Sequence, residues 1–163
     1  MKKISLEFED IIGRYFNLKV KKHNYRIYVE EAGKGTPLLC LHTAGSDGRQ
    51  FRHILNDKKI TNNYRVIVFD LPWHGKSNPP EGYELNDYKL TTNLYKQIIM
   101  SFCKQYKLKS PVIMGCSMGG RVVLHLALEQ SNYFKAVIAL EGADKLEPYY
   151  GLDWLYRPDV HGG

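Results

Sequence analysis

The sequence predicts an α/β fold: a mostly parallel sheet with helices on both faces, preceded by an antiparallel N-terminal hairpin. Three short apolar runs, each followed by a polar or small-residue turn, cover residues 37–42, 66–70 and 111–114. Strands that are buried on both faces are nearly continuous in apolar residues, so these runs predict parallel strands. Amphipathic stretches between them supply crossover helices, which place helices on both sides of such a sheet.

An alternating pattern near the N-terminus predicts the hairpin. Apolar and polar residues alternate over 16–22 and again over 25–31, with Asn24 as the expected turn. The antiparallel strands therefore come first in the chain and the parallel strands afterwards.

Capping residues and helical periodicity predict the helices. Ser46 or Asp47 is a candidate N-cap for a helix that extends to about residue 57. Asp87 is expected to cap the next helix, whose apolar residues recur at helical spacing: Leu94, Ile98, Ile99 and Phe102. A third helix buries a face that begins at Val122, and residues 135–140 predict the strand that follows it.

The segment Gly115-Cys116-Ser117-Met118-Gly119 carries the main chemical signal. It lies between a predicted strand and a predicted helix, so Ser117 is expected at a sharp turn. A serine hydroxyl becomes a nucleophile when it is exposed, oriented and deprotonated by a neighbouring base. The flanking glycines let strand and helix approach closely. Cys116 is the alternative nucleophile, but the central residue of such a turn is the one that faces a substrate.

Two further loops follow predicted strands. Residues 43–48 form a small-residue loop that can turn backbone N–H groups toward a developing negative charge. Residues 71–77 form the loop after the strand at 66–70.

The two loops at 43–48 and 71–77 and the segment at 115–119, in this order along the chain, resemble motifs of the α/β-hydrolase superfamily. The resemblance is to its esterase-like serine hydrolases and covers about residues 15–145. The resemblance implies that Ser117 is the nucleophile. It also implies that the backbone N–H groups of Ala44 and Met118 form the oxyanion hole. Asp is the nucleophile of the superfamily's epoxide hydrolases and dehalogenases, so a serine favours acyl chemistry.

The resemblance also assigns neighbours of the site and shows two departures. By position, His42 and Thr43 line the pocket, and His42 orders the oxyanion loop by hydrogen bonding. Thr43 and Trp73 stand where the family usually has glycine. A β-branched Thr43 narrows the pocket, which affects the expected substrate shape and leaves the reaction type unchanged.

The acid and the base of a catalytic triad are less clearly marked. The family order is Ser, then Asp or Glu, then His, and only residues 118–163 follow Ser117. Glu141 follows the last predicted strand and is a candidate acid; the competing interpretation is a strand-end carboxylate that lines the pocket. Asp144 is a weaker candidate. His161 is the only histidine of the sequence beyond the helix that is predicted to follow Ser117.

The length predicts an incomplete hydrolase. Residues 1–145 match the N-terminal part of such a core, and residues 146–163 are expected to begin a lid or to form a frayed C-terminus. The remaining half, in the same polypeptide or in a partner chain, would then supply the base. Alone, this chain is expected to be weakly active or inactive.

The expected function is cleavage of a small carboxylic ester or related acyl compound through an acyl-enzyme at Ser117. The alternative is a non-catalytic hydrolase-like module that binds a small molecule. No cofactor and no metal are expected, because no metal-ligand spacing occurs. The net charge of +6 and the pI near 9.1 come from scattered lysines, so nucleic acid is not an expected partner. No apolar run approaches the roughly 18 residues of a membrane span, so a membrane is not an expected partner either. Three cysteines without C-x-x-C spacing favour the cytoplasm. The oligomeric state stays open.

Overall fold

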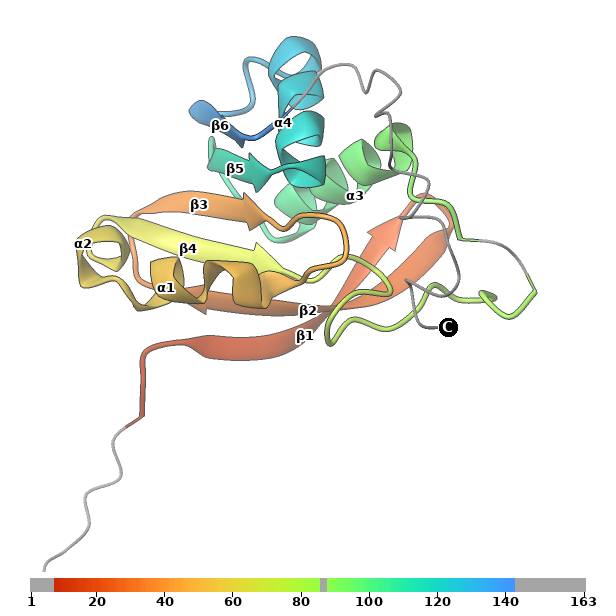
Figure 1. The fold of residues 1–163 in the computed structure, drawn as a ribbon, viewed down its shortest axis with the longest axis horizontal. Coiled ribbons are helices and arrows are strands. Elements are labelled where there is room, and N and C mark those ends of the chain that lie inside the picture. The colour runs from red at the N-terminus through yellow and green to blue at the C-terminus, as the bar shows by residue number, and fades with distance from the viewer. Residues whose placement is uncertain (1–7, 86–87, 143–163) are drawn as a thin grey trace, which may run out of the picture.

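A six-stranded sheet organises the computed structural model, which describes residues 8–85 and 88–142 (Figure 1). The strand order is β1-β2-β4-β3-β5-β6. The β1–β2 and β2–β4 pairs are antiparallel, and the remaining pairs are parallel. The strands have these bounds: β1 (Ile12–Val20), β2 (His23–Ala32), β3 (Thr36–Leu41), β4 (Tyr64–Phe69), β5 (Val112–Cys116) and β6 (Ala136–Leu140). The predicted fold class is confirmed.

The N-terminal hairpin forms as predicted, but its turn lies earlier than expected. Val20 pairs with His23, so Lys21 and Lys22 make the two-residue loop. Lys21 adopts a φ of 53°, and two-residue loops with positive φ match the twist of the flanking strands. The prediction of Asn24 as the turn was wrong, because Asn24 already pairs within β2.

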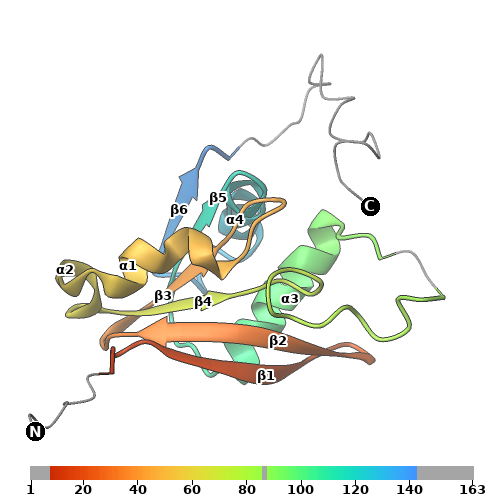
Figure 2. The same cartoon turned by 60° about the horizontal axis from the view of Figure 1, so that its bottom comes forward.

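Helices cover both faces of the sheet (Figure 2). On one face lie α3 (Thr92–Gln105) and α4 (Met118–Glu129), and on the other lie η1 (Gly48–Phe51), α1 (Arg52–Asn56) and α2 (Lys58–Thr61). Each face has its own buried apolar cluster. As a result β3, β4 and β5 are buried from both sides, which explains why their sequences are continuously apolar.

One helix prediction is confirmed and another was wrong. Asp47 caps the first helical segment, accepting the Arg49 N–H at 2.9 Å, and η1 and α1 together end at Asn56, close to the expected residue 57. Asp57 has an extended ψ of 110° and caps α2 with its own side chain. Asp87 lies outside the described residues, and the cap of α3 is Thr91, whose hydroxyl accepts the Leu94 N–H. Asp, Asn and Thr side chains all cap helices well, so the local sequence is compatible with more than one start for this helix.

β6, at the edge of the sheet, has no fully buried residue. Its residues on the face of α1 are exposed, with Ile138 at 40% and Leu140 at 44%. Residues 143–163, including the segment predicted to begin a lid, lie outside the described residues. Within the described ranges, no helix combines the length and apolar content that a membrane crossing requires.

Candidate active site

Ser117 occupies the turn between β5 and α4 with an unusual backbone conformation. Its φ is 51° and its ψ is −109°, a region that non-glycine residues rarely occupy. Its N–H donates to the Leu140 carbonyl at 2.8 Å, and its carbonyl accepts the Arg121 N–H at 2.7 Å. The side chain is exposed at the carboxyl edge of the parallel strands. This combination, an extended segment followed by an exposed serine at a strained bend, is what a nucleophile elbow requires.

Close backbone contacts leave no room for a side chain at Gly115 or Gly119, the glycines two residues before and after Ser117. A β-carbon at Gly115 would lie 2.2 Å from the Gly119 carbonyl oxygen. A β-carbon at Gly119 would lie 2.6 Å from the Leu41 carbonyl oxygen and 3.0 Å from that of His42. The turn therefore closes tightly on itself, and the end of β3 lies against the start of α4.

Backbone N–H groups are available beside this turn. Met118 is the first residue of α4, so its N–H has no helical carbonyl four residues before it. Ala44 lies exposed in the loop after β3, and its N–H donates no hydrogen bond within the described part of the chain. The Thr43 N–H is occupied, because it donates to Gln50 Oε1 at 2.9 Å. A helix N-terminus favours negative charge, so this edge of the sheet suits a developing oxyanion.

His42 holds two loops together from a fully buried position. Its Nε2 accepts the Leu71 N–H at 3.1 Å, so its Nδ1 carries the proton and donates to the Thr43 carbonyl at 2.8 Å. Burial lowers the pKa of His42 below its ordinary value, and the nearby His74 acts in the same direction. Asp70, Asp47 and the Thr43 carbonyl oppose that shift in the pKa. His42 therefore links the loops after β3 and β4 from a buried position, and Thr43 is half-buried at the start of the loop after β3.

The lowered pKa of His42 predicts that stability falls as pH decreases. The unfolded chain takes up a proton near pH 6.5, before the folded chain does. The contribution of His42 is therefore present above about pH 6.5 and is lost as the pH falls below that value. We expect urea unfolding to show a free energy that declines from pH 7.5 to pH 5. The decline should shrink in His42→Asn and persist in His53→Gln, since His53 is exposed. Equal slopes in all three proteins would contradict the prediction.

Asp70 is a structural residue that the sequence reasoning missed. It is 5% exposed at the end of β4, and its carboxylate accepts the N–H groups of Gly48 and Lys76, both at 2.7 Å. Its carbonyl accepts the Ser77 hydroxyl at 2.7 Å. Asp70 therefore holds the loop after β3 against the loop after β4. A carboxylate directly after an apolar strand was the available signal.

Asp47 forms the neighbouring buried carboxylate. Arg49 hydrogen-bonds both of its oxygens, and this pairing lowers the pKa of Asp47 to about 2. Asp47 therefore keeps its negative charge at neutral pH and holds the start of the helical segment after β3.

Glu141 lies next to the turn at Ser117. The carbonyl of Leu140 accepts the Ser117 N–H, so the following residue, Glu141, begins directly beside Ser117. Glu141 is exposed and has a φ of 50°, so like Ser117 it is a non-glycine residue in the left-handed region. Two other candidates from the sequence, Asp144 and His161, lie outside the described residues. Cys116 is partly exposed although its neighbour Gly115 is buried.

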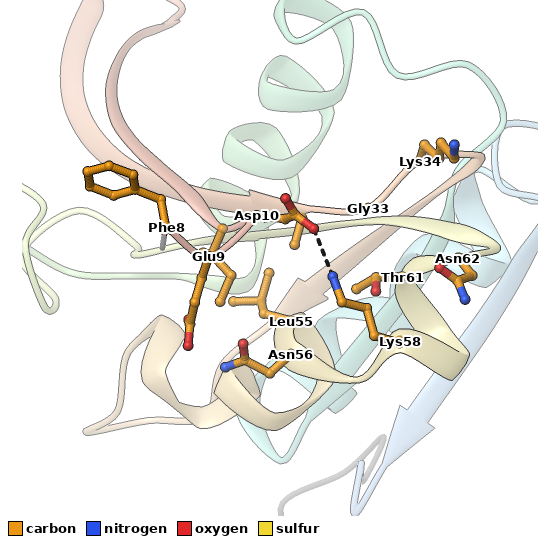
Figure 3. Close-up of a pocket in the computed structure, with 12 residues that line it drawn as sticks. Phe8, Glu9, Asp10, Gly33, Lys34, Leu55, Asn56, Lys58, Thr61 and Asn62 are labelled. Atoms are coloured by element: carbon orange, nitrogen blue, oxygen red, sulfur yellow. Dashed lines mark hydrogen bonds and ion pairs between the residues drawn. The ribbon is translucent and has the colours of Figure 1, made fainter. Parts of the chain in front are cut away.

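A cavity of about 630 Å³ lies at the opposite end of the sheet (Figure 3). It is bounded by the segment before β1, the end of β2 and the helices α1 and α2. Asp10 and Lys58 form an ion pair at 2.8 Å across it. Ala32 in its wall pairs with Val66 near the start of β4, whereas Ser117 follows the end of β5. The cavity is therefore separate from the candidate site.

Comparison with known proteins finds relatives of this chain. A family model for the alpha/beta hydrolase fold matches residues 36–159. AB hydrolase superfamily protein YisY of Bacillus subtilis is 29% identical over 134 residues, which cover 81% of this chain and 46% of that protein. Pimeloyl-[acyl-carrier protein] methyl ester esterase of Vibrio cholerae is 24% identical over 119 residues, 73% of this chain and 42% of the relative.

A solved structure shares the fold. Epoxide hydrolase VrEH1 from Vigna radiata superposes with a TM-score of 0.70 at 21% identity, over 92% of this chain and 47% of that protein. The chain spans less than half the length of the relatives named here.

Proposed function

The chain belongs to the α/β-hydrolase family, and from that premise we propose that the whole protein is a serine hydrolase that cleaves a small carboxylic ester or related acyl compound. The family itself is a family of hydrolases with several reaction types. The observation that carries the choice among them is Ser117: an exposed serine at φ 51° at the bend between β5 and α4. Strained residues of this kind concentrate at functional sites.

The proposed reaction proceeds in two steps. Ser117 Oγ forms a bond to the acyl carbon as a histidine takes its proton, and the N–H groups of Met118 and Ala44 stabilise the oxyanion. The tetrahedral intermediate expels the alcohol, which receives that proton. Water then attacks the acyl-enzyme by the same route and releases the acid.

The residues that complete the triad are part of the proposal. His42 is unsuited to be the base, because both of its ring nitrogens are already hydrogen-bonded to backbone groups. From the family order of serine, acid and histidine, we place the base outside the described residues, with His161 as the candidate in this chain. Glu141 is the candidate acid, supported by its position directly after the residue that accepts the Ser117 N–H.

A fluorophosphonate probe tests the proposal on the full-length protein. We expect labelling of the wild type, loss of labelling by a factor of about 100 or more in Ser117→Ala, and reduced labelling in Glu141→Gln. Ser110→Ala is the matched control, because Ser110 is also exposed at a positive φ of 44° but precedes β5 instead of following it. A wild-type protein that binds small esters without being labelled would favour the alternative, a non-catalytic binding module.

A further inference from the structure

Trp73 lies in the loop after β4 in a conformation that suits glycine. Its φ is 66°, its N–H donates to the Asn78 carbonyl at 3.0 Å, and its side chain is 50% exposed. We propose that Trp73 and Tyr83 form an aromatic subsite that binds an aryl group of the substrate. This inference rests on the proposed function only in taking that substrate to be an ester cleaved at Ser117.

The backbone of Trp73 is the first argument. In the left-handed region a β-carbon crowds the following carbonyl oxygen, so a bulky residue there is a genuine outlier. Glycine adopts the same φ without strain. A strained bulky residue persists where its surroundings impose the conformation, and such residues cluster at ligand-binding sites. The side chain of Trp73 gains little from burial in return, because half of it stays in contact with water.

The arrangement of the rings is the second argument. The Trp73 and Tyr83 rings lie 5.0 Å apart between centroids at an interplanar angle of 69°. Tyr83 is 39% exposed, and Tyr88 supports Trp73 from 6.2 Å. Two touching rings at a steep angle offer a flat ligand ring one face contact and one edge contact, the arrangements that aromatic groups prefer. A quaternary ammonium group would instead need rings that stand apart around it.

The position of the loop is the third argument. Trp73 precedes His74, whose ring lies 5.1 Å from that of His42. The loops that follow β4, β3 and β5 come from neighbouring strands of the sheet. Since neighbouring strands are about 4.8 Å apart, the end of β4 lies about 10 Å from the end of β5, where Ser117 begins the elbow. The loop that carries Trp73 and the turn that carries Ser117 thus begin about 10 Å apart, a separation that an aryl ester can bridge.

Binding without turnover gives the first test. The full-length protein with Ser117→Ala and Trp154→Phe keeps Trp73 as the single tryptophan of the sequence printed here, which has two. Its fluorescence is titrated with phenyl acetate and with cyclohexyl acetate, which differ in the flatness and aromaticity of the ring. We expect the emission of Trp73 to respond to phenyl acetate at concentrations about tenfold lower than those needed for cyclohexyl acetate. Equal responses, or none, would overturn the subsite.

Turnover gives the second test. In a catalytically intact protein, Trp73→Gly is expected to lower the ratio of kcat/KM for phenyl over cyclohexyl acetate by about tenfold. The variant should still fold, because glycine accepts φ 66°. Tyr64→Leu is the control, since Tyr64 is an exposed aromatic residue at the start of β4, away from this edge. If both proteins hydrolyse the esters and Trp73→Gly leaves the ratio of kcat/KM unchanged, the aromatic subsite is overturned and the proposed function stands. Selective binding without hydrolysis of either ester would overturn the proposed function and leave the subsite standing.

Discussion

Replacing Gly115 with alanine is expected to destabilise the protein by about 3 kcal/mol and to reduce fluorophosphonate labelling of Ser117 strongly. The new β-carbon would lie 2.2 Å from the Gly119 carbonyl oxygen and 2.8 Å from the Gly120 nitrogen. Both atoms belong to the backbone of α4, so no side chain can rotate away to make room. The start of α4 must move relative to β5, and the elbow that holds Ser117 moves with it.

Urea unfolding and probe labelling measure the two effects. Gly45→Ala is the matched control, because nothing lies within 4 Å of a β-carbon there, and its φ of 64° accounts for the whole expected cost. That cost is about 1 kcal/mol, from the left-handed conformation alone. If both alanine variants lost the same stability, close packing at the elbow would not be the cause.

Replacing Asp70 with alanine is the second change for which we expect a large effect, about 3 kcal/mol of lost stability. The carboxylate is the acceptor for the N–H groups of Gly48 and Lys76, and each donor left unsatisfied costs about 1–3 kcal/mol. The loops after β3 and β4 would also lose their common anchor. Labelling of Ser117 by the fluorophosphonate should also fall, because the loop after β3 carries Ala44, whose N–H is a proposed donor to the oxyanion.

The measurement is again urea unfolding, with Asp57→Ala as the comparison. Asp57 also accepts a backbone N–H, that of Lys59 at 2.8 Å, but it is exposed at a helix cap. Its loss should cost about 1 kcal/mol. An Asp70→Ala protein as stable as Asp57→Ala would show that water replaces the buried carboxylate without penalty.

Local patterns in the sequence were sufficient for the elements that depend on local chemistry. Alternation over 16–22 and 25–31 predicted the hairpin, and continuous apolar runs predicted β3, β4 and β5. Boundaries failed where neighbouring residues compete for the same role. Thr91 caps the helix for which Asp87 was the expected cap. Such competition is decided by which backbone donor each side chain reaches.

The sequence by itself determined the fold class and the position of Ser117 at the turn between a strand and a helix. Only the tertiary structure decided which loops meet there. The contacts of His42 with Leu71 and of Asp70 with Gly48 join residues 29 and 22 positions apart. They depend on β3 lying beside β4 in the sheet, although other elements separate the two strands in the sequence. Periodicity reports which face of an element is buried, whereas the order of strands depends on packing and loop closure between distant segments, and no local pattern carries that information.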